Sequence, residues 1–231
     1  MFQNVLEKTT KRPTVVNGII DLVFNALLQK KIKPGDMLPS ENELSRQLGV
    51  GKSSVREAIK MLSAIGIVES IQGEGTYIRT SIDESAVNPL IYQMVFMQET
   101  NDNIFELRYI FEPAYVQLAM EKATAEDIEL IQEAAKILED KVRTNEQTAK
   151  DDIAFHEAIL NATHNPLVIR IGRTILQLFE ASIQKSMMSI PEQAVSDHKS
   201  ILEAFKSKDS SLLHNAVIKS FEGWKRMLNK E

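Results

Sequence analysis

The sequence predicts a mainly α protein in which an N-terminal winged helix-turn-helix, itself α+β, is followed by an antiparallel bundle of about six helices. Three observations support this fold class. Two short amphipathic helices flank a tight turn in residues 38–62, a two-stranded hairpin follows directly, and strand signals vanish beyond residue 90. The 231 residues suffice for two modest domains, which we assign to 1–80 and 90–231, with a linker at 81–89.

The helix-turn-helix is predicted to follow an upstream helix over residues 15–30. Its first helix covers 41–47, the turn is Gly49-Val50-Gly51, and the second helix covers 53–62. Short hydroxyls and cations gather where the second helix begins: Lys52, Ser53, Ser54 and Arg56. A recognition helix needs such side chains to meet phosphates and base edges in the DNA major groove.

The hairpin completes the predicted DNA-binding domain. Its strands are expected at 67–71 and 76–79, and the chain turns at Gly73-Glu74-Gly75. Another turn, at Lys33-Pro34-Gly35-Asp36, ends the connection from the upstream helix. A helix-turn-helix followed directly by a hairpin is a winged helix, so the sequence predicts a DNA-binding module here.

Residues 12–79 resemble the DNA-binding domain of the GntR family of bacterial transcription regulators. Four segments carry the resemblance: Pro34-Gly-Asp-Met-Leu-Pro-Ser-Glu41, Leu44 to Val50, Val55-Arg-Glu-Ala58 and Gln72-Gly-x-Gly-Thr76. The resemblance implies that the start of the recognition helix and the wing tip touch the operator, through Lys52, Ser53, Ser54, Arg56 and Gly73. Asn42 stands where the family commonly has a guanine-reading arginine, and asparagine pairs better with adenine.

Charge is divided unevenly between the two predicted domains. The whole chain has a net charge of −5, yet residues 1–80 contain 11 lysines and arginines against 8 acidic residues, a net of +3. The remaining residues contain 16 against 24, a net of −8. The basic part is the part that would meet phosphate, and its weak charge implies modest non-specific DNA affinity with a real salt dependence.

The composition also bears on the compartment. The chain has no cysteine, which excludes disulfides and thiolate metal sites. Its amino terminus lacks an apolar signal core, and no run of about 18 apolar residues exists to cross a membrane. We therefore expect a cytoplasmic protein with no membrane partner.

Helical periodicity runs through the second predicted domain. Apolar residues recur at steps of three or four, as on a helix packed on one side: Ile104, Leu107, Phe111, Ala114 and Leu118. Pro113 lies inside this pattern and should bend the helix or interrupt its hydrogen bonding. A second helix opens at Thr124, and four more are predicted at 149–163, 166–188, 192–207 and 210–229.

Four polar side chains are predicted to converge inside this bundle. Asp152 and His156 are four residues apart, so they project from one face of a helix, which neighbouring apolar residues turn inward. His198 lies on the apolar side of its helix, and Arg108 lies at the edge of a buried stripe. Together they can hold a divalent metal, a small carboxylate ligand, or both. The same spacing also fits a helix-surface hydrogen bond and histidines that only fill the core.

Residues 104–228 resemble the all-helical FCD effector domain of the FadR-like GntR subgroup. Four segments carry the resemblance: Glu106-Leu-Arg-x-x-x-Glu-Pro113, Asp152-x-x-Phe-His156, Asn165-Pro166 and Asp197-His-x-x-Ile-x-x-Ala204. In many members an aspartate and three histidines bind a divalent, zinc-like metal that grips an organic acid. The resemblance therefore implies that Asp152, His156 and His198 are metal ligands here.

The third histidine of that pattern is replaced by Ser220. His164 lies at a helix end and His214 lies about 120° round the helix, so neither supplies a substitute. Two readings follow. Water or the acid completes a three-ligand site for one metal per subunit, or a polyhydroxylated acid binds directly to Arg108, His156, His198 and Ser220. A hydroxyl lining suits a sugar acid, which favours the second reading.

The sequence as a whole predicts a ligand-responsive, DNA-binding homodimer that reads a pseudo-palindromic operator in double-stranded DNA. We expect a repressor of a carbon-catabolism operon, released by a small effector that is a sugar acid or hydroxy acid. One alternative is a helical metal-dependent hydrolase fused to a DNA-binding module, with an open position on the metal. No general base and no nucleophile set accompany the ligands, which argues against it. A DNA-binding protein without effector would not need an inward polar cluster.

Overall fold

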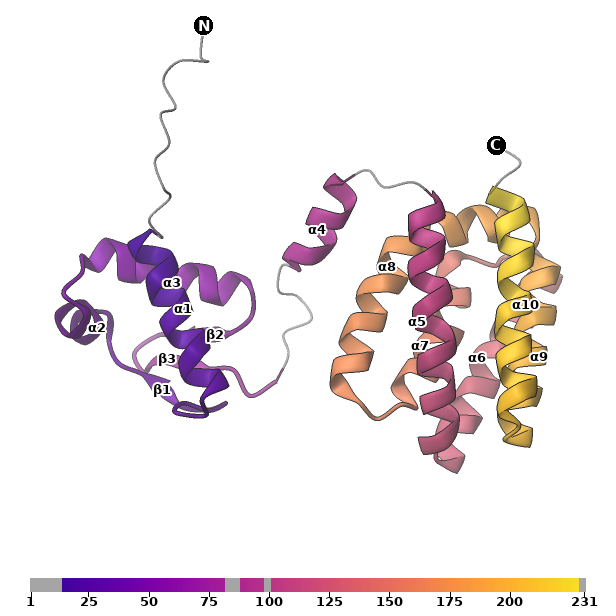
Figure 1. The fold of residues 1–231 in the computed structure, drawn as a ribbon, viewed down its shortest axis with the longest axis horizontal. Coiled ribbons are helices and arrows are strands. Elements are labelled where there is room, and N and C mark those ends of the chain that lie inside the picture. The colour runs from indigo at the N-terminus through magenta and orange to yellow at the C-terminus, as the bar shows by residue number, and fades with distance from the viewer. Residues whose placement is uncertain (1–13, 82–87, 98–100, 229–231) are drawn as a thin grey trace, which may run out of the picture. The chain divides into compact units, whose positions relative to one another are not determined.

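The structure is a computed structural model that describes residues 14–81, 88–97 and 101–228. The chain divides between Pro89 and Leu90 into two compact units, and each is considered by itself (Figure 1). The linker predicted at 81–89 falls mainly on residues 82–87, outside the described residues. Among the described residues, none of the helices combines the length and apolar character needed to cross a membrane.

The first unit is a winged helix-turn-helix. Its elements follow in the order α1 (Val15–Leu28), β1 (Met37–Leu38), α2 (Glu41–Leu48), α3 (Lys52–Ala64), β2 (Val68–Ile71) and β3 (Gly75–Ile78). The sheet is antiparallel with strand order β1-β3-β2, so β3 lies in the middle and pairs Met37 with Tyr77 and Val68 with Ile78 across its two edges. The short strand β1 was not predicted from the sequence.

Local sequence signals explain why α2 and α3 form where they do. Ser40 accepts a hydrogen bond from the backbone N–H of Glu43, and the Glu43 carboxylate accepts one from the Ser40 backbone, which is a complete capping box at the start of α2. Gly49 ends α2 with φ of 66°, a left-handed conformation that glycine adopts without strain. The turn therefore fixes how α3 is presented.

The second unit contains a short helix, α4 (Pro89–Phe96), and six long ones. These are α5 (Asn101–Lys122), α6 (Ala125–Thr144), α7 (Ala149–Asn161), α8 (Pro166–Ser189), α9 (Pro191–Ser207) and α10 (Ser210–Leu228). In Figure 1, α5 and α10 run side by side. The six long helices agree with the predicted bundle, and the predicted fold class is confirmed.

Helix α5 agrees with its prediction in one respect and differs in another. It continues through Pro113, and the proline interrupts the hydrogen bonding, because it cannot donate the bond that the Tyr109 carbonyl would otherwise accept. The predicted apolar stripe, however, is not the face that is most deeply buried, because Ala114 is exposed whereas Arg108 and Glu112 are buried. The helix thus turns an arginine and a glutamate into the bundle, which the hydrophobic pattern alone did not predict.

A glycine sets the close approach of α7 and α8. A Cβ atom built on Gly172 would clash with both terminal methyl groups of Leu160. Gly172 is buried within α8, and Leu160 is completely buried near the end of α7. The missing side chain lets α8 pack tightly on the helix that carries Asp152 and His156.

Candidate functional site

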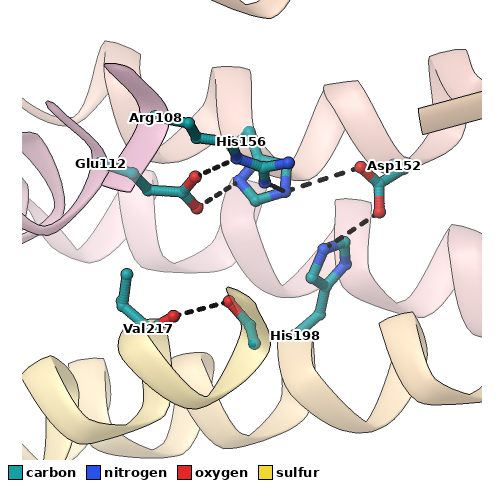
Figure 2. A network of polar contacts seen from close by, with 7 residues as sticks. Arg108, Glu112, Asp152, His156, His198 and Val217 are labelled. Carbon is teal, nitrogen blue, oxygen red and sulfur yellow. Dashed lines mark hydrogen bonds and ion pairs between the residues drawn. The ribbon is translucent and has the colours of Figure 1, made fainter. Parts of the chain in front are cut away.

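Three helices of the bundle bring a cluster of polar side chains together (Figure 2). Arg108 and Glu112 come from α5, Asp152 and His156 from α7, and His198 from α9. All five are buried, with between 2% and 8% of their surface exposed. Charged side chains are almost never buried to this degree unless they are paired, so their contacts decide what the cluster can do.

The contacts form a continuous chain centred on His156, which lies between Glu112 and Asp152 in Figure 2. Arg108 Nε donates to Glu112 Oε2 at 2.5 Å, and Arg108 Nη2 lies 3.1 Å from His156 Nε2. Nδ1 of His156 lies 3.0 Å from Glu112 Oε1, at ion-pair distance although the ring N–H is not aligned for a hydrogen bond. Asp152 closes the chain, with Oδ2 3.6 Å from His156 Nε2 and Oδ1 3.3 Å from His198 Nε2.

The charges within the cluster stabilise one another. Burial favours a raised pKa at Glu112, but Arg108 and His156 outweigh it and hold the pKa well below its usual range. Burial likewise opposes ionisation of Asp152, and His198, His156 and Arg108 still lower its pKa to about 2. Burial lowers the pKa of His198, against the attraction of Asp152. Two ionised carboxylates thus face one guanidinium and two imidazoles within the buried cluster.

Part of this cluster lines a cavity of about 50 Å³. Residues from α8, α9 and α10 contribute to the wall, among them Ile183, Ser186, Gln193, Asp197, Ser220, Phe221 and Trp224. Aromatic rings surround the Arg108 guanidinium, whose Cζ is 5.4 to 5.7 Å from the ring centres of Phe179, Phe221 and Trp224. Rings at these distances attract the cation and hold its position.

Three of the side chains fit a metal ion. Asp152, His156 and His198 each offer one ligand atom, and these atoms lie within 4.8 Å of one another. The two histidines approach different oxygens of Asp152: His198 Nε2 lies 3.3 Å from Oδ1, and His156 Nε2 lies 3.6 Å from Oδ2. One carboxylate and two imidazoles also suit zinc or a similar divalent metal chemically.

Ser220 lies at the cavity but does not replace a ligating histidine. Its hydroxyl donates to the Val217 carbonyl of the same helix at 2.7 Å, as Figure 2 shows. The hydroxyl is therefore committed to the helix backbone and presents only lone pairs to the cavity. His164 bonds instead to Asp127 at 2.8 Å, and His214 is exposed and does not line this cavity.

Glu112 is the member of the cluster that sequence reasoning assigned no role. It follows Arg108 by four residues, the spacing at which opposite charges meet on one helix face, and this was the available signal. Such pairs are common on exposed helix surfaces, so the spacing did not by itself indicate a buried site.

The winged helix presents a second candidate site, made of exposed side chains. Asn42, Lys52, Ser53, Arg56 and Gly73 are exposed and Ser54 is half-buried. Lys52 begins α3, whose N-cap Gly51 makes no side-chain capping bond, so the first backbone N–H groups of α3 stay open to an anion. Gly73 lies in the turn between β2 and β3 with φ of 85°.

Arg56 is held in place by a carboxylate on the neighbouring helix. Its Nε and Nη2 atoms donate to Glu41 Oε2 at 3.1 and 2.8 Å. The hydrogen bond from Arg56 lowers the pKa of Glu41. The guanidinium is thereby ordered on the exposed face near the start of α3. Sequence reasoning did not identify Glu41.

A winged helix joined to a helical bundle with a polar cavity defines a ligand-responsive, DNA-binding transcription regulator. Comparison with known families agrees. Residues 16–78 match the bacterial regulatory proteins of the gntR family, and residues 103–222 match the FCD domain. The chain belongs to the GntR family and carries an FCD domain, which confirms both resemblances. The matching families and relatives are regulators rather than enzymes, so the hydrolase alternative is not favoured.

Individual relatives support the assignment. The HTH-type transcriptional regulator LutR of Bacillus subtilis is 37% identical over 156 residues, 68% of this chain and 71% of LutR. The putative L-lactate dehydrogenase operon regulatory protein of Escherichia coli is 29% identical over 212 residues, 87% of this chain and 81% of that protein. The solved structure of Streptococcus agalactiae GntR is 24% identical with a TM-score of 0.62, covering 92% of this chain and 100% of that one. This last likeness shows the fold.

Proposed function

We propose that this regulator represses a carbon-catabolism operon and that a small organic acid bound in the bundle cavity releases it from DNA. The observation that carries the proposal is the cavity wall, where Arg108, Asp152, His156 and His198 are buried beside open space. A bundle with only a structural role would gain nothing from burying these groups. Relatives named for L-lactate dehydrogenase and galactonate operons point to the same class of effector.

The size of the cavity favours a hydroxy acid of a few carbons over a sugar acid. Its volume of about 50 Å³ is small beside the roughly 300–1,000 Å³ of pockets for drug-sized ligands. The Arg108 guanidinium supplies the bidentate donor that a carboxylate prefers. A short acid can reach Arg108 with its carboxylate while its hydroxyl faces the histidines.

One zinc-like divalent metal per subunit, held by Asp152, His156 and His198, belongs to the proposed site. The spacing of the three donors supports this reading over direct binding of the acid without metal. When bound, the metal would supply positive charge for the oxygens of the acid. Ser220 leaves a coordination position that the acid or water can take.

DNA recognition is proposed to rest on Asn42, Lys52, Ser53, Ser54, Arg56 and Gly73. The exposure of most of these side chains and the open start of α3 support contacts with phosphates and base edges. A homodimer would place two winged helices on the halves of a pseudo-palindromic operator.

An apolar groove between α5 and α10 is proposed as the surface where the two copies meet. The groove has a volume of about 520 Å³, and its ten lining residues include no aspartate, glutamate, lysine or arginine. Ile110 on its edge is 74% exposed. An uncharged, exposed surface of this kind is typical of the centre of an interface between identical subunits.

The effector proposal is tested with DNA that the purified protein itself selects from a random double-stranded library. L-lactate, glycolate, malate, galactonate and glucuronate are then added singly while DNA affinity and Tm are measured. A hydroxy acid of two to four carbons should raise Tm and weaken DNA binding. His198→Ala should lose this response, whereas His164→Ala, which removes a histidine that pairs with Asp127 outside the cavity, should keep it. If no acid changes DNA affinity, or if His198→Ala responds normally, the proposal is wrong.

The dimer proposal is tested by light scattering on the full chain. Ile110→Glu should convert the dimer to a monomer, because a charge would be buried in an apolar interface. Leu167→Glu is the matched control, since Leu167 is also 74% exposed but lies outside the groove. Equal dimer content in both variants would contradict the proposed surface.

A further inference from the structure

The Nε2 atom of His156 has two competing uses. It lies 3.1 Å from Arg108 Nη2, and it is the ring nitrogen that faces Asp152, 3.6 Å from Oδ2, on the side where the three candidate metal ligands meet. A guanidinium can only donate hydrogen bonds, so in this contact the imidazole nitrogen must supply its lone pair. A metal ion binds through that same lone pair. One lone pair cannot serve both, so the two contacts exclude each other.

Glu112 connects the two partners. It accepts from Arg108 Nε at 2.5 Å and lies 3.0 Å from Nδ1 of His156. A carboxylate beside Nδ1 favours the proton on that nitrogen, which leaves the Nε2 lone pair available to Arg108 or to a metal. Glu112 therefore anchors the inner end of the guanidinium while its outer end remains able to move.

We propose that Arg108 competes with the divalent metal for Nε2 of His156 and thereby sets the metal affinity of the cluster. The inference rests on the metal-and-acid site proposed above. When the metal takes Nε2, the guanidinium keeps its contact with Glu112 and its place among Phe179, Phe221 and Trp224. Its outer nitrogens are then free for the carboxylate of the acid.

This competition couples the two ligands. The metal releases Arg108 from His156, and the acid stabilises the released guanidinium, so each ligand favours the other. By linkage the effect is reciprocal, and the acid should tighten metal binding by the same factor by which the metal tightens acid binding. Arg108 is the residue through which this coupling passes.

The test is a Zn²⁺ competition titration of the chelator-stripped full chain, without acid or DNA. Arg108→Lys keeps the positive charge and can still pair with Glu112, but its shorter side chain should not reach His156. Competition predicts that this variant binds Zn²⁺ about tenfold more tightly than the unmodified protein, within the range that changes around metal ligands produce. Simple charge repulsion predicts equal affinities, so equality would overturn the proposal. Arg143→Lys, on an exposed part of α6, is the control and should change nothing.

Two further measurements keep the proposal testable if Arg108→Lys folds poorly. On the unmodified protein, Zn²⁺ should shift the side-chain ¹⁵N resonances of Arg108, and unchanged resonances would overturn the proposal. L-lactate should tighten Zn²⁺ binding more in the unmodified protein than in Arg108→Lys, and equal tightening would overturn it. If neither protein binds Zn²⁺, the competition is wrong, while release of DNA by a metal-free acid remains open to its own test.

Discussion

The two units of this regulator contain the same chemical pair in opposite surroundings. In the winged helix, Arg56 pairs with Glu41, and their side chains are 60% and 35% exposed. In the bundle, Arg108 pairs with Glu112, and theirs are 10% and 2% exposed. Water screens the charges of Arg56 and Glu41. Arg108 and Glu112 are buried, and protein atoms rather than water surround them. The comparison teaches that exposure, rather than residue type, decides how much a charged pair contributes to the stability of the fold.

In the winged helix, a change to the charged pair should have little effect on stability. In the bundle, a change to the charged pair should affect both stability and ligand binding. An exposed ion pair contributes about 0–1 kcal/mol, so Arg56 can be changed with little effect on folding. A buried charge that loses its partner costs several kcal/mol, so changes at Arg108 or Glu112 should affect both the bundle and its ligand.

The largest effect is expected for Glu112→Ala. Removing the carboxylate leaves the buried Arg108 without its anion, and the bundle should lose about 3–5 kcal/mol of its free energy of unfolding. Trp224 is the only tryptophan of the chain and is buried in the bundle, so urea unfolding followed by its fluorescence reports on this unit. Glu41→Ala is the matched control and should leave the Trp224 transition unchanged. If Glu112→Ala lowered the free energy of unfolding by less than about 1 kcal/mol, the buried pair would matter no more for stability than the exposed pair, and the comparison would fail.

The next effect concerns DNA binding and Arg56→Ala. Loss of one good base contact costs about 1–3 kcal/mol, so operator affinity should fall roughly 5- to 150-fold. Acid binding in the bundle should be unchanged. Lys31→Ala is the control because it removes the same charge from an exposed position outside α3. Fluorescence anisotropy with selected operator DNA measures both variants. Equal losses would mean that Arg56 acts only through net charge.

The sequence predicts most of this fold because its determinants are local. The turn at Gly49, the start of α3 and the breaks before Pro166 and Pro191 are all local signals. The strand β1 escaped prediction because its two residues are ordered by pairing with β3, far along the chain.

The candidate site was only partly predictable for the same reason. The spacing of Asp152 and His156 indicated a shared helix face, and both side chains lie in the cluster. Arg108 was predicted at the edge of a buried stripe, but Glu112 was missed, because rings from α8 and α10, such as Phe179 and Trp224, are what enclose the pair. Helical periodicity places apolar residues inward and cannot foresee that distant aromatic side chains will accommodate an ion pair.

The buried Gly172 and the exposed Gly18 allow the same comparison for side-chain packing. Gly172→Ala should destabilise the bundle, because overpacking against Leu160 costs about 1–3 kcal/mol and the gain in helix propensity returns about 1 kcal/mol. Gly18→Ala should stabilise α1 by up to about 1 kcal/mol, since no atom lies within 4 Å of the added methyl group. Trp224 fluorescence measures the first, and hydrogen exchange of the α1 amides measures the second. If both substitutions stabilised or both destabilised the protein, local packing would not explain their effects.

The smallest effect is expected for Glu41→Gln, which weakens the exposed pair without changing its shape. The hydrogen bond from Arg56 lowers the pKa of Glu41, so the stabilisation it gives is present above the ordinary glutamate pKa and is lost as the pH falls through the lowered value. At pH 7 the variant should lose less than about 1 kcal/mol, and at strongly acid pH the two proteins should become equal. Hydrogen exchange of the α2 and α3 amides, compared at both pH values, measures this difference. A loss at pH 7 as large as that of Glu112→Ala would show that the exposed pair also supports its fold, and the division between the two units would no longer hold.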